Sequence, residues 1–123
     1  MTSASKPLPR RGEIWFVRLH TDPPGKGLRP VLIVSSDARN QSDRADTVLG
    51  IPLTTAVHRE VPTHIHLPAG ETGLSMDSAA KAEEITLILK TELVPPRSAL
   101  RQISHTRICQ LGNAVQSALN CPA

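Results

Sequence analysis

Residues 31–34 form a short, unbroken apolar run (Val-Leu-Ile-Val), and this run constrains the fold more than any other stretch of the chain. A run of this length, bounded by Pro30 before it and by the polar residues 35–37 after it, is typical of a strand buried on both faces. Pro30 has no N–H to donate within a sheet, so it predicts the start of the strand. Arg29 then lies just outside the sheet, as an ordinary surface arginine or as a cation that binds an anion.

Short strand signals recur along the rest of the chain, and one helical pattern follows them. Further strands are predicted over residues 12–19, 47–53, 62–67, 77–80 and 84–89. Residues 36–40 predict one turn of helix, and residues 105–119 predict a longer helix with Ser104 as its N-cap. Closely spaced short strands with one terminal helix predict a mainly β (α+β) domain, built as a small, strongly bent antiparallel barrel.

The length of 123 residues fits one domain with a single core. Residues 1–10 are polar and interrupted by prolines, which predicts a disordered arm before a domain that spans residues 11–120. Trp15 and Phe16 are the only aromatic residues, which excludes binding modules that stack bases on a platform of several rings. The formal net charge of +3 is compatible with a nucleic-acid partner without demonstrating one.

Cysteine use and hydropathy indicate where the protein works. Cys109 and Cys121 are the only cysteines, and two cysteines do not make a disulfide framework, which favours a reducing compartment. The sequence has no signal-peptide core and no apolar run of transmembrane length. We therefore expect a soluble, cytoplasmic protein that makes no use of a membrane.

Few residues suggest chemistry by themselves. His64 and His66 share one face of a predicted strand, but without a carboxylate or cysteine at suitable spacing they do not define a metal site, and no cofactor motif is present. We therefore expect neither a metal nor a cofactor. Lys81 and Glu83 are two residues apart, so in a strand they point to the same side, either as an acid–base couple or as a simple salt pair.

A family resemblance gives these residues more weight. Residues 12–15 (Gly-Glu-Ile-Trp), followed by a loop and by residues 29–35 (Arg-Pro-Val-Leu-Ile-Val-Ser), resemble the opening of the MazF/PemK toxins. Those toxins are ribosome-independent mRNA endoribonucleases of toxin–antitoxin pairs. The resemblance extends, with weaker motifs, over nearly the whole chain from residue 11 to residue 119. Those weaker matches lie at residues 48–55, 62–65, 73–74, 77–78, 83–85 and 103–104.

The resemblance implies an SH3-like β-barrel with a C-terminal helix and a metal-independent, sequence-selective endoribonuclease. In such enzymes the 2′-hydroxyl of single-stranded RNA attacks its own phosphodiester, leaving a 2′,3′-cyclic phosphate and a 5′-hydroxyl. By the same resemblance, Arg29 and Thr54 hold the scissile phosphate, while Glu83 and Lys81 occupy the positions of the base and acid. Lys26 and Thr55 are expected to add RNA contacts beside Arg29 and Lys81.

The resemblance also implies partners, and it has limits. It implies a cognate antitoxin and a homodimer, to which the apolar stripe around Leu111 and Val115 is a candidate contributor. The loop at residues 20–28 is shorter than is usual in the family, and Thr86 stands where an arginine is common. Two other functions stay open: a toxin of the same fold that binds DNA gyrase without cutting nucleic acid, and a decayed member that only binds a partner.

Overall fold

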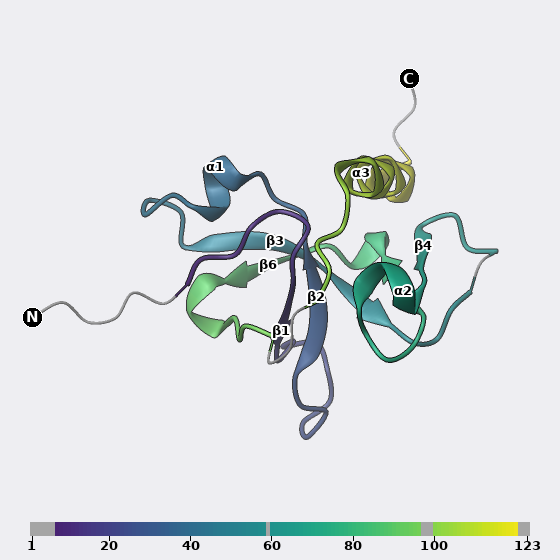
Figure 1. Cartoon of the computed structure of the whole chain (residues 1–123), viewed down its shortest axis with the longest axis horizontal. Helices are drawn as coiled ribbons and strands as arrows, with labels where there is room; N and C mark the ends of the chain where they lie inside the picture. Colours follow the sequence, from purple (N-terminus) through teal and green to yellow (C-terminus); the bar gives the residue numbers. More distant parts are fainter. Residues whose placement is uncertain (1–6, 59, 97–99, 121–123) are drawn as a thin grey trace, which may run out of the picture.

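The computed structural model describes residues 7–58, 60–96 and 100–120. Six strands and one long helix carry the fold, with short helical turns between them (Figure 1). The strands are β1 (Ile14–Val17), β2 (Arg29–Ile33), β3 (Thr47–Thr54), β4 (His64–Leu67), β5 (Ser78–Lys81) and β6 (Thr86–Leu89). The helices are α1 (Asp37–Asn40), α2 (Ala69–Thr72) and α3 (His105–Leu119), and 3₁₀ turns occupy Ala82–Glu84 and Lys90–Glu92.

The long strand β3 organises the sheet. All strand pairs are antiparallel, and the strand order is β1-β2-β3-β5-β4, with β6 also paired to β3. The first half of β3 pairs with β6, and its end pairs with β5. This confirms the predicted class, a mainly antiparallel β-sheet with a C-terminal helix; the pairings among the described residues include none that closes the sheet into a barrel.

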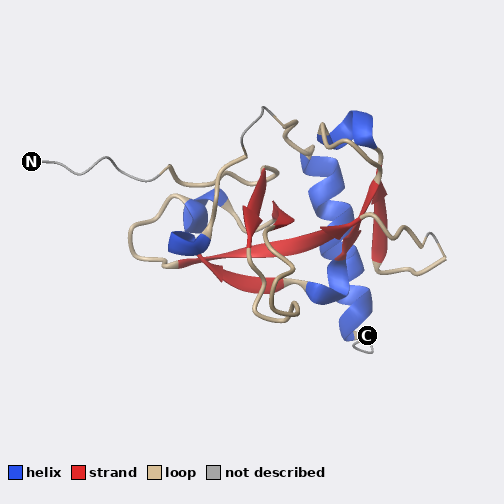
Figure 2. Ribbon diagram, turned by 90° about the horizontal axis from the view of Figure 1, so that it is seen from below, coloured by secondary structure: helices blue, strands red, loops and turns tan. Residues whose placement is uncertain are grey.

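The prediction that the 31–34 run is buried on both faces is confirmed for its first three residues. Val31, Leu32 and Ile33 are each fully buried. Leu32 belongs to a core cluster with Leu111 of α3, whereas Val31 and Ile33 belong to a second cluster on the other face. Alternating side chains of β2 thus enter two separate cores, one beneath α3 and one on the opposite side. Figure 2 shows α3 packed across the strands of the sheet.

Helix α3 begins and ends as its sequence predicts. Ser104 is the N-cap, and its hydroxyl oxygen accepts a hydrogen bond from the Arg107 backbone N–H at 3.3 Å. The apolar stripe packs on this chain's own sheet, because Leu111 is fully buried in the core. The expectation that Leu111 contributes to a dimer interface is therefore wrong, and Val115 also packs against this core.

Three local predictions need correction. The strand predicted over residues 84–89 begins only at Thr86, because the residues just before it form the 3₁₀ turn. The short helix α2 lies between the strands predicted over residues 62–67 and 77–80, where no helix was predicted. Within the predicted arm, residues 1–6 lie outside the described part, but Pro9 is buried and its carbonyl accepts a hydrogen bond from Gln41 Nε2 at 2.8 Å.

No helix in the described part of the chain is long and apolar enough to cross a membrane.

Gly12 joins the start of the domain to both β2 and the segment before α3. Its N–H donates to the Ile33 carbonyl and its carbonyl accepts from the Ile103 N–H, both at 2.8 Å. The φ angle of Gly12 is +91°, and a Cβ added there would lie 2.5 Å from the Ile103 carbonyl oxygen. Only glycine fits this position without strain or a backbone shift.

We expect Gly12→Ala to lower the free energy of unfolding by about 2 kcal/mol, because alanine adds both left-handed strain and a backbone clash. Denaturant unfolding of the two proteins measures the difference. Gly70→Ala is the matched control, since Gly70 has ordinary backbone geometry and nothing within 4 Å of an added Cβ. Equal destabilisation by the two substitutions would contradict the role assigned to Gly12.

Candidate functional site

An open groove with a volume of about 960 Å³ runs across the ends of three neighbouring strands. It is lined by five of the six residues that the sequence singled out. These are Lys26, Arg29, Thr54, Thr55 and Lys81. These five residues come from distant parts of the chain and meet in one place, as predicted. Glu83 was predicted to join them, but it does not line the groove.

The strand order explains why these side chains meet. Arg29 is the first residue of β2, Thr54 the last of β3 and Lys81 the last of β5. β3 lies between the other two strands, and both run antiparallel to it. Because side chains alternate along a strand, Arg29 shares a face with Val31 and Ile33, and that face is opposite α3. The groove thus lies on the face of the sheet that α3 leaves uncovered.

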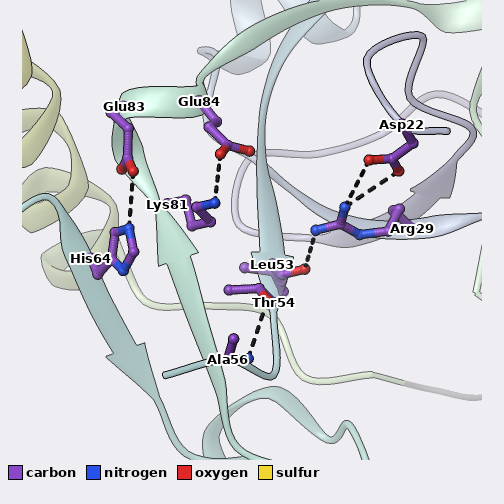
Figure 3. A network of polar contacts seen from close by, with 9 residues as sticks. All are labelled: Asp22, Arg29, Leu53, Thr54, Ala56, His64, Lys81, Glu83 and Glu84. Carbon is purple, nitrogen blue, oxygen red and sulfur yellow. Dashed lines mark hydrogen bonds and ion pairs between the residues drawn. The ribbon is translucent and has the colours of Figure 1, made fainter. Parts of the chain in front are cut away.

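Arg29 is the first residue of β2, which corrects the expectation that it lies just outside the sheet, and its half-buried guanidinium is already paired with an anion of the same chain. Nη1 donates to both carboxylate oxygens of Asp22, at 3.1 and 3.3 Å, and Nη2 donates to the Leu53 carbonyl at 3.1 Å (Figure 3). Only 17% of the Arg29 side chain and 13% of the Asp22 side chain are exposed. Arg29 is therefore already neutralised by Asp22, a counter-ion from the same chain.

Thr54 lies at the end of β3, directly beside the carbonyl that Arg29 contacts. Its hydroxyl oxygen accepts a hydrogen bond from the Ala56 N–H at 3.1 Å, which fixes the oxygen and leaves the hydroxyl hydrogen to be donated. Thr55 and Lys26 are exposed on the rim. The arrangement offers a fixed hydroxyl donor next to a fixed guanidinium.

The predicted couple of Lys81 and Glu83 does not form, because the two side chains have different partners. Lys81 ends β5, whereas Glu83 lies in the 3₁₀ turn that follows. Lys81 Nζ lies 2.6 Å from Glu84 Oε2, while Glu83 Oε2 lies 2.9 Å from His64 Nε2 on β4 (Figure 3). Glu84 lines the groove and Glu83 does not.

The surroundings of Glu83 also make it a weaker base. Burial by itself would raise the pKa of the Glu83 carboxyl, but hydrogen bonds from His64, from its own backbone N–H and from Thr63 together hold that pKa below its ordinary value. A lower pKa means a lower affinity for the proton that a general base must accept. Through its pair with His64, Glu83 links the 3₁₀ turn to β4.

Four groove residues were missed by the sequence prediction. Asp22 comes from the 20–28 loop, and His20 Nε2 pairs at 3.3 Å with Glu92 Oε2 across the same groove. Glu84 was passed over because the strand pattern favoured Glu83. The sequence shows that Asp22 and Glu84 are acidic. It does not show their partners, because Arg29 and Lys81 lie on other elements.

The described residues contain no group of three or more His, Cys, Asp or Glu side chains placed to hold a metal ion. The two histidines of β4 have separate carboxylate partners: His64 pairs with Glu83, and His66 Nε2 lies 3.3 Å from Asp77 Oδ2.

Comparison with known proteins places the chain in a family. Residues 10–119 match the family model of the PemK-like, MazF-like toxins of type II toxin–antitoxin systems. Endoribonuclease MazF9 of Mycobacterium tuberculosis (strain ATCC 25618 / H37Rv) is 31% identical over 119 residues, which cover 90% of this chain and 96% of that relative.

Solved structures agree with this match. An endoribonuclease in complex with its cognate antitoxin, from a mycobacterial species, has a TM-score of 0.68 at 27% identity, covering 94% of this chain and 98% of that chain. A MazE–MazF complex from Deinococcus radiodurans has a TM-score of 0.70 at 20% identity, covering 94% and 99% of the two chains, and it supports the fold alone.

The sheet and the C-terminal helix are thus those of a small β-domain toxin. The chain belongs to the PemK-like, MazF-like toxin family of type II toxin–antitoxin systems. It is a homologue of an endoribonuclease over 90% of its length.

The Glu83–His64 pair predicts a pH-dependent contribution to stability. Because the pKa of Glu83 is lowered in the folded state, the stabilisation is present above the unfolded pKa of about 4.3 and is lost as the pH falls through the folded value. Glu83→Gln should cost about 0.5–1 kcal/mol at pH 7, a modest amount because 36% of the side chain is exposed. The cost should decrease as the pH falls below about 4.3 and vanish once the Glu83 carboxyl is protonated in the folded protein as well.

Urea unfolding of the two proteins across this pH range measures the effect. A stability difference that stays constant down to the acid end would show that the ionised Glu83 carboxylate is not its source.

Proposed function

We propose that this protein is the toxin of a toxin–antitoxin pair and cuts single-stranded RNA, including mRNA, at selected sequences without a metal. The observation that carries the proposal is the groove in which Arg29, Thr54 and Lys81 converge from neighbouring strands, together with Glu84 from the 3₁₀ turn. The family match and the endoribonuclease relative support the same activity. Together they favour the nuclease over a gyrase-binding toxin, which has no need of this polar cluster.

The proposed reaction uses the nucleophile that RNA itself carries. The 2′-hydroxyl oxygen bonds to the adjacent phosphorus, the bond from phosphorus to the 5′-oxygen breaks, and the products are a 2′,3′-cyclic phosphate and a 5′-hydroxyl. One group must accept the proton of the 2′-hydroxyl and another must protonate the leaving 5′-oxygen. Cations and hydrogen-bond donors must stabilise the extra negative charge on the five-coordinate phosphorus.

Each of these tasks has a candidate in the groove. Arg29 holds the phosphate and stabilises the developing charge, and Thr54 donates its hydroxyl hydrogen to a phosphate oxygen. Glu84 replaces Glu83 as the proposed base, because it lines the groove and lies against Lys81. Lys81 is the proposed acid, and it acts also as a second cation.

RNA binding in this groove would depend on the sugar–phosphate backbone more than on ring stacking. Trp15 is 5% exposed, so one of the two aromatic residues is unavailable to a base. Lys26 and Thr55 on the exposed rim can bind flanking phosphates. Sequence selectivity would then come from the loop at residues 20–28, which contributes residues to the groove, and from the segment at residues 56–61.

The proposed protein partners are a cognate antitoxin and a second copy of the chain. The relative solved together with its cognate antitoxin supports the first. A groove that presents Arg29 and Lys81 suits an acidic, partly disordered antitoxin segment by charge complementarity. The homodimer is proposed from the family resemblance. Its interface does not include Leu111, because that residue is fully buried within the chain.

Variants of the groove should separate catalysis from folding. Arg29→Ala should lower the cleavage rate of a defined single-stranded RNA by a factor of about 100 to 1,000, because a preorganised partner of the transition-state charge is lost. Glu84→Gln should lower the rate by about 100-fold or more, through loss of the base. Single-turnover cleavage, followed on a sequencing gel, measures both effects.

Glu83→Gln is the matched control, since it makes the same chemical change one residue away and outside the groove. It should leave the cleavage rate within about three-fold of the wild type. The reverse result, with Glu83→Gln inactive and Glu84→Gln active, would return the base to Glu83. A folded Arg29→Ala variant that cuts at the wild-type rate would overturn the site assignment.

The nucleophile can be tested on the substrate. A single 2′-deoxy nucleotide on the 5′ side of the scissile phosphate should stop cleavage there, because the attacking hydroxyl is missing. Binding should weaken little, since phosphate contacts supply most of the affinity. EDTA should leave cleavage of the all-RNA strand unchanged, because an internal hydroxyl needs no metal-activated water. Cleavage of the deoxy strand would identify water as the nucleophile, and rescue by a divalent ion after EDTA would overturn the proposal that no metal is needed.

A further inference from the structure

We propose that Asp22 is a positioning residue for RNA cleavage, one that orients the Arg29 guanidinium and weakens RNA binding in the ground state. The inference rests on the proposed function, because it assigns Arg29 to the scissile phosphate. Its starting point is the pair itself, in which both side chains are mostly buried and both Asp22 oxygens face Arg29 Nη1. A surface ion pair would leave both partners free to move in solvent.

Asp22 is anchored although it belongs to a loop. Its backbone N–H donates to the Leu19 carbonyl at 3.1 Å, and Leu19 is 8% exposed within the core cluster on the groove side of the sheet. Pro23 and Pro24 follow directly and restrict the chain on the other side. The loop is thus anchored on both sides of Asp22, and it holds the Asp22 carboxylate in place beside Arg29.

The contacts of Arg29 fix the plane of its guanidinium. Nη1 donates to Asp22 and Nη2 to the Leu53 carbonyl, so two of its three nitrogens are tied to different elements. An arginine has five N–H groups, and among the described residues the printed bonds of Arg29 use only Nη1 and Nη2, so N–H groups remain to bind a ligand in the groove. Thr54 follows Leu53 directly, so the contact that orients the guanidinium also sets its place beside the Thr54 hydroxyl (Figure 3). Such preorganisation lowers the reorganisation needed when charge develops on phosphorus.

The Asp22 carboxylate that helps catalysis by orienting Arg29 also weakens the binding of RNA in the ground state. Asp22 lies 3.1 Å from Arg29 Nη1, so it offsets much of the positive potential that an incoming phosphate meets. Ground-state RNA binding is weakened, while the oriented donors remain for the additional negative charge of the transition state. Interactions that are stronger in the transition state than in the ground state are those that raise kcat.

Two substitutions separate orientation from charge. Asp22→Ala removes both, so kcat should fall at least 10-fold while the Kd for RNA becomes lower. Asp22→Asn keeps an oxygen that can accept from Nη1 and loses only the charge, so it should recover most of kcat and keep the tighter binding. Rates are measured in single turnover on an RNA that the wild type cuts. Affinities are measured with the same RNA carrying a 2′-deoxy nucleotide at the scissile position.

The salt dependence of binding supplies a readout that a structural role would not change. Removing a carboxylate from the groove should make the slope of log K against log[salt] steeper by up to about 0.7 for a single strand. Asp43→Asn is the matched control, because Asp43 is exposed and precedes the opposite end of β3. The eight residues of β3 span roughly 25 Å, well beyond the screening length of about 8 Å at physiological salt.

The outcomes distinguish this inference from the proposed function. A wild-type protein that cuts no RNA overturns both. If the wild type cuts and Asp22→Ala keeps its kcat, positioning by Asp22 is overturned while the nuclease stands. Weaker RNA binding by both variants would overturn the electrostatic part. If Asp22→Asn is as slow as Asp22→Ala and loses the acidic limb of the rate–pH profile, Asp22 is a base and the positioning role is overturned.

Discussion

The burial of β2 and β3 on both faces is the constraint on which the rest of the structure depends. Leu32 and Ile51 pair across these strands and enter the core beneath α3, while Val31, Ile33 and Val48 enter the core on the other side. A strand held from both sides cannot slip by one residue without exchanging its two sets of side chains. The register of β2 on β3 is therefore strongly specified, and it fixes Arg29 beside the end of β3. The position of the groove follows from hydrophobic packing, although none of its polar residues contributes to that packing.

The charges of the groove show why the net charge of the chain says little about its site. The basic groove residues Arg29 and Lys81 are each paired with a carboxylate of the same chain, Asp22 and Glu84. An RNA backbone would therefore meet a surface whose positive potential is already partly compensated. Cations that keep an internal carboxylate beside them attract a phosphate less strongly than bare cations do. In the proposed reaction, such a groove would stabilise the additional negative charge of the transition state more than the phosphate charge of the bound RNA.

The sequence predicted those features that depend on local pattern. The buried run at β2, the helix at His105–Leu119 and its Ser104 cap all follow from the spacing of apolar residues and from capping chemistry. The family motifs predicted the meeting of Arg29, Thr54 and Lys81, which lie far apart along the chain. Asp22 could not be found in this way, because its contact with Arg29 depends on the path of a loop that contains two prolines and two glycines of positive φ. No periodicity encodes such a path.

The pair Glu83–Glu84 shows how one local change of conformation alters a functional assignment. In a strand, Lys81 and Glu83 would share one face, because side chains repeat every two residues. In a 3₁₀ turn there are three residues per turn, so neighbouring side chains diverge by about 120°. Ala82–Glu84 adopts the 3₁₀ conformation, and its two carboxylates accordingly reach different strands, Glu83 to His64 on β4 and Glu84 to Lys81 on β5. Ala82, fully buried in the core beneath α3, holds the turn against the helix. The choice of carboxylate presented to the groove is therefore made by packing on the far face of the sheet, where no RNA would bind.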